Sequence, residues 1–390
     1  MSDGDALRQA VLANPDEDTP RLIYADWLDE TGQGDRAAFI RHQIEAVRAD
    51  PFSGQARNAT KRAGSLLEKY GAVWHAHIRE VIQGQLEDFV GVQVSDSLVS
   101  PLRDVVKVKA RFERGFIGHV TLQPPVFARA ANGIFGAEPI QSLELIRFAT
   151  PDVVPLQPVF EVPELGHLRR LEFARLQGIT EDEYAAMLTC PHLSGLRDLS
   201  LRENVVPPPL LVDVFSGDRF PELQGLDISE IPNLGPGLVS AFARANHREI
   251  RRLNVSGVIF NSDNLRQLLT SRCLRTVEEL RLGYAGLAGV AGPLSHINPG
   301  WVLPLERLVI LDLKGQRLGN EGVGDILKQS ASSALRWLGL SFNGLDSGVL
   351  RFFTESKHLS LNHLDVRGNN FTPSGIKALK DRFPDAVIEV

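Results

Sequence analysis

The side chains whose types and spacing could do chemistry begin with a carboxylate pair near the N-terminus. Asp26 and Asp29 are three residues apart in a segment of helical pattern, so both would lie on one helix face. Two such carboxylates can bind a cation or act as an acid and a base. The alternatives are a solvated face with Trp27 in the core, which we favour, or an ion pair with Arg21 at the start of the same helix.

Two histidines and two cysteines are further candidate ligands or nucleophiles. His75 and His77 would share a face only in a strand, whereas their segment has a helical pattern and no third ligand nearby. Cys190 and Cys273 occupy similar places before a strand position, where a buried thiol is an ordinary core group. The phosphate-loop, serine-hydrolase, zinc-protease and dinucleotide motifs are absent. We therefore predict no catalytic residue, no metal and no cofactor, and a protein that is not an enzyme.

Charge and hydropathy narrow the classes of binding partner and the cellular compartment that we expect for this protein. The net charge of −6 and the pI of about 6.0 show no basic domain, so no nucleic-acid partner is expected. No run of uncharged apolar residues is long enough for a membrane span, and the first residues lack the pattern of a secretory signal. Two cysteines outside any metal-binding pattern suit a reducing compartment. We expect a cytoplasmic protein without a membrane partner.

A repeat provides the elements that must position any site. A pair of apolar residues two apart, mostly Leu-x-Leu, recurs with spacings of 28, 28, 27, 27, 27, 31, 27 and 26 residues. We call the first residue of each pair the anchor. The anchors are Leu143, Leu171, Leu199, Leu226, Leu253, Leu280, Leu311, Leu338 and Leu364. Weaker copies start at Val120 and Ile388. Such self-similarity at a fixed period is the signature of a repeat protein.

Each repeat predicts a short strand followed by a helical return. Side chains two apart share one strand face, and stacked copies form a parallel sheet whose connections cross on the other side. Thr180 and Glu183 match a capping box, and Thr372 stands before a proline at a helix start. The sequence thus predicts an α/β horseshoe solenoid, with parallel strands on the concave face and helices on the convex face.

Residues 116–390 resemble the ribonuclease-inhibitor-like leucine-rich repeat family. The turn asparagine of that family, five residues after the anchor, is present only at Asn204, Asn343 and Asn369. The other repeats are therefore expected to have looser or differently shaped turns. Residues 283–304 form an abnormal, Gly- and Pro-rich return. It is either a tolerated insertion or a partner-specific loop that displays His296 and Trp301.

The N-terminal 50 residues predict a small helical domain. Three helices are expected, and the second opens at Thr19 and ends at Gly32. Leu22, Ile23, Ala25 and Leu28 are expected to face Leu7, Val11, Phe39 and Ile40 in its core. In residues 51–115 the sequence predicts a helix over 60–80 and one or two strands over 89–112. The whole region 51–115 is expected to cover the first edge of the solenoid.

The same N-terminal segment closely resembles the repeat-companion domain, a short module at the N-terminus of many bacterial repeat proteins. The matching residues are Pro15, Asp16, Asp18, Thr19, Pro20, Arg21, Leu22, Tyr24, Ala25, Asp26, Trp27, Leu28, Gly32, Asp35, Arg36, Phe39 and Ile40. The resemblance implies a bacterial protein with a helical domain at 1–50, a connecting region at 51–115 and leucine-rich repeats at 116–390. It implies no activity.

The outward residue between the two apolar positions of each repeat defines the candidate surface. These residues are mostly acidic and are flanked by basic groups, so a bound peptide or protein could run along them. The candidate protein-binding residues are Asp227, Arg281, Asp312, Lys314, Trp337, Asp365 and Arg367. They predict a non-catalytic protein–protein interaction scaffold that binds a protein or peptide on the concave face of the repeat domain. The alternative is a regulatory or inhibitory subunit of an enzyme that docks through its N-terminal helices.

Overall fold

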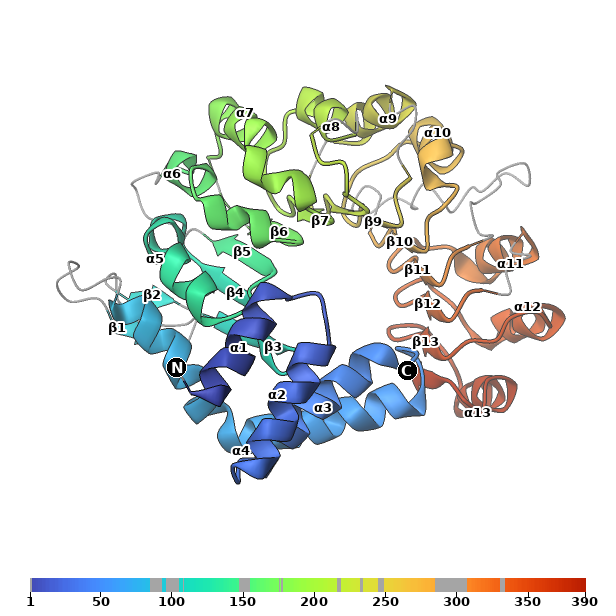
Figure 1. Ribbon diagram of the computed structural model, residues 1–390. Helices are drawn as coiled ribbons and strands as arrows, with labels where there is room; N and C mark the ends of the chain where they lie inside the picture. The colour runs from blue at the N-terminus through green and yellow to red at the C-terminus, as the bar shows by residue number, and fades with distance from the viewer. Residues whose placement is uncertain are drawn as a thin grey trace. The chain divides into compact units, whose positions relative to one another are not determined.

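Figure 1 shows the protein as a computed structural model, in which the chain divides into two compact units. Unit 1 is Met1–Leu196 and unit 2 is Arg197–Val390. The structure describes residues 2–84, 93–95, 105–107, 109–146, 155–174, 176, 178–215, 219–231, 234–244, 249–284, 307–329 and 334–390. Of the abnormal return at 283–304, residues 285–304 lie outside the described residues. His296 and Trp301 are among them.

Unit 1 begins with four helices. They are α1 (Asp3–Ala13), α2 (Thr19–Glu30), α3 (Gly34–Arg48) and α4 (Gly54–Gly84). The first three agree with the predicted helices, and α4 is longer than the expected 60–80. Ser2 caps α1 through a capping box with Asp5. Gly32, with φ of 81°, follows the end of α2 in the left-handed conformation that glycine adopts without strain.

The N-terminal helices share a core with the first strand of the repeats. Ala25 and Leu28 of α2 are buried with Val11 of α1, Ile40 of α3 and Phe116. The prediction for Ile23 was wrong, because its side chain is 48% exposed. On a helix only one stripe can face the core, and the stripe of α2 runs through Arg21, Ala25 and Leu28.

The rest of unit 1 contains the first repeats. Its strands are β1 (Gln93–Ser95), β2 (Val105–Lys107), β3 (Lys109–Glu113), β4 (Phe116–Leu122), β5 (Ser142–Ile146) and β6 (Arg170–Ala174). Its helices are α5 (Pro124–Ala137), α6 (Gln157–Phe160) and α7 (Glu181–Thr189), with 3-10 helices η1 (Pro163–His167) and η2 (Pro191–Gly195). Strands β4, β5 and β6 are parallel, whereas β3 pairs antiparallel with β4 and so covers its edge. The predicted strands at 89–112 thus supply a strand that covers the first repeat.

Unit 2 continues the strand–helix alternation. Its strands are β7 (Asp198–Ser200), β8 (Gly225–Asp227), β9 (Arg252–Asn254), β10 (Glu279–Arg281), β11 (Ile310–Asp312), β12 (Trp337–Gly339), β13 (His363–Asp365) and β14 (Val387–Glu389). Its helices are α8 (Pro208–Phe215), α9 (Gly235–Arg244), α10 (Ser262–Leu269), α11 (Gly319–Gln329), α12 (Leu350–Glu355) and α13 (Pro373–Arg382). The 3-10 helices are η3 (Arg272–Leu274) and η5 (Ser347–Val349). Helices α11 to α13 all lie on one side of β11 to β13 (Figure 1).

The register of the strands confirms the predicted anchors. Leu226 lies opposite Leu199 and Leu253, and the same pairing continues through Leu280, Leu311, Leu338 and Leu364. The weaker copies are also strands, since Val120 lies opposite Leu143 and Ile388 opposite Leu364. The anchors are buried in every repeat. The fold is therefore an α/β leucine-rich repeat solenoid with an N-terminal helical region.

Side-chain hydrogen bonds stabilise the helix starts and the turns of the repeats. Thr180 forms the predicted capping box with Glu183, and Thr372 caps α13 ahead of its proline. Asn343 is buried and donates from Nδ2 to the carbonyls of Leu313 (2.8 Å) and Ser341 (3.2 Å). Both predicted core thiols are buried, and each donates to a helix carbonyl, Cys190 to Phe160 and Cys273 to Phe242.

Candidate functional site

The outward residues between the buried apolar positions form one continuous row in unit 2, which we call the central lane. Strand register places each member directly opposite the next, in the order Asp227, Asn254, Arg281, Asp312, Gly339, Asp365 and Glu389. Neighbouring strands are about 4.8 Å apart, so side chains along the lane can bond to one another. Four of the seven predicted binding residues belong to it.

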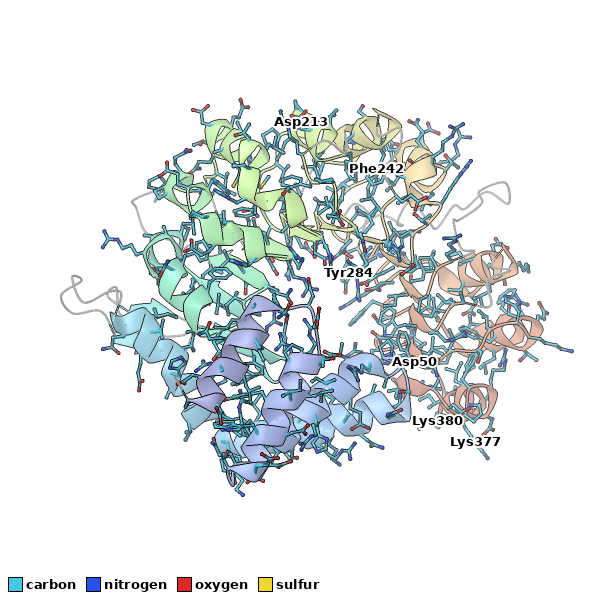
Figure 2. All side chains as sticks on the ribbon, in the orientation of Figure 1. Asp50, Asp213, Phe242, Tyr284, Lys377 and Lys380 are labelled. Carbon is cyan, nitrogen blue, oxygen red and sulfur yellow. The ribbon has the colours of Figure 1, made fainter. Side chains whose placement is uncertain are left out.

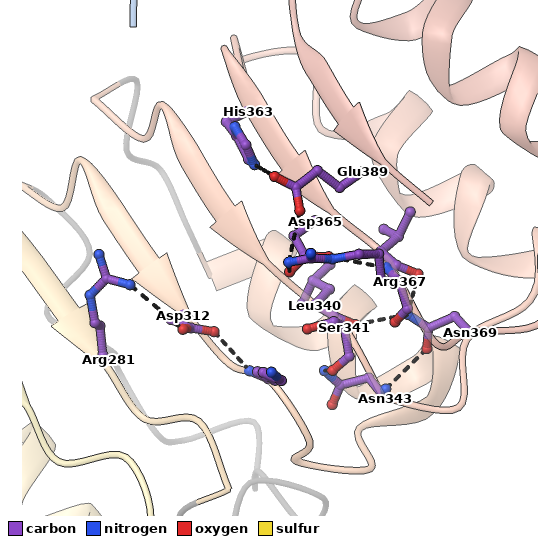
Figure 3. Close-up of polar contacts among 12 residues, drawn as sticks. Arg281, Asp312, Leu340, Ser341, Asn343, His363, Asp365, Arg367, Asn369 and Glu389 are labelled. Atoms are coloured by element: carbon purple, nitrogen blue, oxygen red, sulfur yellow. Dashed lines mark hydrogen bonds and ion pairs between the residues drawn. The ribbon is translucent and has the colours of Figure 1, made fainter. Parts of the chain in front are cut away.

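Asp365 and Arg367 form the tightest part of the site. The Arg367 guanidinium bonds both oxygens of Asp365, at 2.9 and 2.8 Å, and reaches Glu389 at 2.7 Å (Figure 3). His363 reaches the other oxygen of Glu389 at 3.1 Å. Asp365 is only 4% exposed, while Arg367 is exposed. The buried carboxylate therefore holds an arginine whose outer side remains open to a partner.

Trp337 connects this group to Arg281. Its indole lies over Gly339, where an added Cβ would overlap the ring, and it stacks on the His363 ring at 5.6 Å between centroids. The Arg281 guanidinium lies 5.5 Å from the indole centroid, within cation–π range. Three side chains from β10, β12 and β13 are thus layered. Tryptophan and arginine in such a setting are the residues that dominate binding energy at interfaces.

Two carboxylates of the central lane have opposite pKa shifts. Burial raises the pKa of Asp312, against a backbone hydrogen bond from Lys314 and the nearby charge of Arg281, and the charge of Asp365 adds to the rise. Burial also acts to raise the pKa of Asp365, but the bonds from Arg367 outweigh it and hold that pKa below its ordinary value. Arg281 is 3.8 Å from Asp312, too far for a strong bond, and its closer partner is Glu279 at 2.6 Å.

The remaining predicted residues, Asp227 and Lys314, lie at the two sides of this group. Asp227 is bonded by Ser229 at 2.6 Å and by the Asn254 amide at 3.0 Å. Lys314 makes no ion pair among the described residues; its ammonium instead lies 5.4 Å from the ring centroid of Tyr284 and 5.6 Å from that of Phe342. The structure thus joins Arg281, Asp312 and Trp337 in one group, and Asp365 with Arg367 in the next, while Asp227 is held by its own neighbours.

Tyr284 and Phe342 were missed by the sequence analysis. They are 47% and 50% exposed, and Figure 2 labels Tyr284 on the strand side of unit 2. Both stand four residues after an anchor, where glycines recur at Gly257, Gly315 and Gly368. Glycine recurring at one position of the repeat indicates left-handed backbone at that position. A bulky residue there is unusual, and this sequence signal could have identified Tyr284 and Phe342 as candidate site residues.

The carboxylate pair of α2 is a surface ion-pair site. Arg41 of α3 bonds Asp26 at 2.7 Å and Asp29 at 2.6 Å, so the suggested partner, Arg21, was wrong. Arg21 is buried and donates to the carbonyl of Pro15 at 2.9 Å. Helix α2 turns Arg21 inward with Ala25 and Leu28, away from the two aspartates. His75 lies on helix α4, as predicted, and its Nε2 is 3.2 Å from the Ala110 carbonyl oxygen.

Hydrogen bonds from arginine side chains join the N-terminal helices to the turn between β3 and β4. Arg36 lies among the rings of Phe39, Trp74 and Phe112, at 4.7 to 5.3 Å from their centroids, and donates to the Gly115 carbonyl at 2.6 Å. Burial lowers the pKa of Arg36 to about 10. Arg114 in the same turn donates back to the Pro15 carbonyl at 2.7 Å. Helices and first repeat are therefore joined by reciprocal bonds.

Neither a metal site nor a membrane span is found in the part of the chain that the structure describes. No group of three or more His, Cys, Asp or Glu side chains there is placed to hold a metal ion. None of the helices seen in those residues is both long and apolar enough to cross a bilayer.

Comparison with known proteins gives remote structural likenesses only. No family model and no curated protein matches the chain. An internalin of Listeria monocytogenes is similar over 64% of this chain and 60% of its own length, at 15% identity and a TM-score of 0.35. A chain of the yeast Rad7 and Elc1 complex is similar over 87% and 93%, at 15% identity and 0.42, and a chain of the TLR13–ssRNA13 complex over 63% and 32%, at 14% and 0.35. This chain thus spans less than two thirds of the internalin and TLR13 chains. The leucine-rich repeat fold is shown by the register of the strands, in which the anchor leucines lie opposite one another.

Proposed function

We propose that this protein is a non-catalytic interaction scaffold that binds a partner protein or peptide on the outward face of the strands of unit 2. The observation that supports the proposal best is the Arg281–Trp337–His363 stack beside the exposed Arg367. Aromatic and arginine side chains fixed by their neighbours lose little conformational freedom on binding, which favours affinity. The bacterial, cytoplasmic origin expected from the sequence is part of this proposal.

A charge-reversal pull-down tests the proposal. Asp227, Asp312 and Asp365 are changed together to Lys in the full chain, which then serves as bait in an extract of the native host. Loss of the partner, with an unchanged circular-dichroism spectrum, supports the proposal. A matched control reverses three exposed carboxylates elsewhere in unit 2, namely Asp263, Asp381 and Asp385. Because Asp365 is buried, a second variant, Trp337→Ala, guards against misfolding; full partner recovery with this variant and with a folded triple variant would contradict the proposal.

The second candidate is a regulatory or inhibitory subunit of an enzyme, docked through the N-terminal helices. The bonds of Arg36 and Arg114 support a different role for those helices, that of a cap on the first repeat, because a repeat array needs its end covered. Deletion of residues 1–50 separates the two. A folded repeat region that has lost its partner favours docking, and loss of the fold of unit 1 favours the cap.

A further inference from the structure

The strand ends of unit 2 carry a row of left-handed residues four positions after each anchor. Their φ angles lie between 52° and 74°, and the row consists of Glu203, Glu230, Gly257, Tyr284, Gly315, Phe342 and Gly368. Large residues and glycines alternate from Glu230 onward. The row therefore places a large side chain next to a residue that has none.

Each large side chain lies over the glycine of the next repeat. An added Cβ at Gly315 would overlap the Tyr284 ring, one at Gly368 the Phe342 ring, and one at Gly257 the Glu230 carboxylate. The two rings are thus supported from below and remain about half exposed. Exposed aromatic rings held in place by glycines, on backbone that bulky residues rarely adopt, suggest a binding role, because strained conformations cluster at ligand sites.

Lys314 lies between the two rings. It belongs to the intervening repeat, and its ammonium is within 6 Å of both centroids. Its charge also acts on the carboxylate of Asp312, two residues earlier, without a close ion pair between the two among the described residues. The arrangement presents one cation between two apolar surfaces. A complementary ligand has an anionic group between two apolar groups.

The distance between the two rings indicates which backbone conformation a peptide ligand would need in order to contact both. Tyr284 follows β10 and Phe342 follows β12, so the two are two strands, or about 10 Å, apart. A polyproline II helix has three residues per turn and rises about 3.1 Å per residue, so every third residue returns to one face about 9 Å further on. Prolines three apart match the rings, and rings are the groups that recognise such segments.

We propose that Tyr284, Lys314 and Phe342 bind a polyproline II segment of a partner protein. Two prolines three apart lie on the rings, and an acidic residue between them, which projects from the adjacent edge of the three-sided helix, pairs with the long side chain of Lys314. This inference rests on the proposed function and names the chemistry of the partner. A single-stranded nucleic acid would also offer stacking groups and anions. A nucleic acid carries a phosphate at every nucleotide, whereas the site places one cation, Lys314, between its two rings, so a peptide with one acidic side chain between two prolines is favoured.

The test uses a fluorescent repeating Pro-Pro-Glu peptide and the full chain, with anisotropy as the readout. Saturable binding is expected, with affinity about tenfold weaker for a Gly-Ser-Glu repeat of equal charge, which lacks the preformed helix. Tyr284→Gly and Phe342→Gly should each weaken binding about tenfold, because each removes an aromatic anchor without straining the left-handed backbone. Glu230→Gly, at the equivalent position two repeats earlier than Tyr284, is the matched control and should leave binding unchanged. Lys314→Gln should weaken binding and reduce its dependence on salt.

Three results would overturn the inference: no saturable binding of the Pro-Pro-Glu repeat, equal binding of the Gly-Ser-Glu repeat, or stronger binding of polyuridylate RNA. Failure here is distinguishable from failure of the proposed function. If the charge-reversed variant loses its native partner while the peptide does not bind, only the polyproline site is wrong.

Discussion

The indole of Trp337 covers Gly339, two residues further along the same strand, and a methyl group at Gly339 would overlap both the indole and the Asp312 carboxylate. Residues two apart share a strand face, so only a residue without a side chain lets the ring lie flat between Arg281 and His363. The glycine is therefore part of the candidate binding surface, although it can contribute no contact of its own.

Gly339→Ala is expected to displace Trp337 and break its stack with His363. The overlap should cost about 1–3 kcal/mol of unfolding free energy, as for other overpacked sites, and should weaken partner binding. Urea denaturation and near-ultraviolet circular dichroism measure the two effects. Gly64→Ala in α4, where an added Cβ meets nothing within 4 Å, is the control and should stabilise the chain by about 1 kcal/mol. An unchanged aromatic signal in Gly339→Ala would contradict the proposed stack.

Arg36→Ala is expected to destabilise unit 1 by about 2–4 kcal/mol. The change leaves a cavity among Phe39, Trp74 and Phe112 and removes the donor to the Gly115 carbonyl. Arg36→Lys should also destabilise, since an ammonium cannot replace a planar group stacked on rings. Lys61→Ala, on the exposed side of α4, is the control and should change stability by less than about 0.5 kcal/mol. Equal urea midpoints for all three variants would rule out the proposed cap contact.

Removal of the charge is expected to have opposite effects on the stability of the fold at Asp312 and at Asp365. The pKa of Asp365 is lowered in the fold, so its stabilising effect is present at neutral pH and is lost as the pH falls through that lowered value. The pKa of Asp312 is raised, so its contribution is present in acid and is lost as the pH rises through the raised value.

At neutral pH, Asp365→Asn should therefore cost about 1.5–3 kcal/mol through the weakened bonds of Arg367, whereas Asp312→Asn should leave stability unchanged or increase it. Thermal unfolding between pH 3 and 8 measures both. If Asp365→Asn loses as much stability relative to the wild type in acid as at neutral pH, the shift of Asp365 is not present.

Asn343→Ala is expected to cost about 2–3 kcal/mol, because it leaves the buried carbonyl of Leu313 and the amide of Leu318 without their partner. Asn370→Ala is the control; its side chain is exposed, and its effect should lie within about 0.5 kcal/mol. Denaturant midpoints compare the two, and similar small losses would show that the turn does not depend on the asparagine.

The sequence alone determined the repeat, its register and most of the caps. Spacing and the two-residue period of a strand are local properties, so the positions of Leu226, Leu253 and Leu280 in the chain suffice to place them opposite one another. The predicted residues Arg281, Asp312 and Trp337 do meet for the same reason. The division into 1–50, 51–115 and 116–390 stays a prediction, as does the companion-domain resemblance.

Only the tertiary structure decided which side chains pair across elements. Helix α2 turns Arg21 into the core and leaves Asp26 and Asp29 to Arg41 of α3, a choice that depends on the packing of two helices. Tyr284 and Phe342 come from separate repeats, and the stacking of strands places them on either side of Lys314. Repeat spacing predicts which strand positions lie opposite one another, but the orientation of side chains and the packing of one helix on another depend on the three-dimensional structure, which that spacing does not encode.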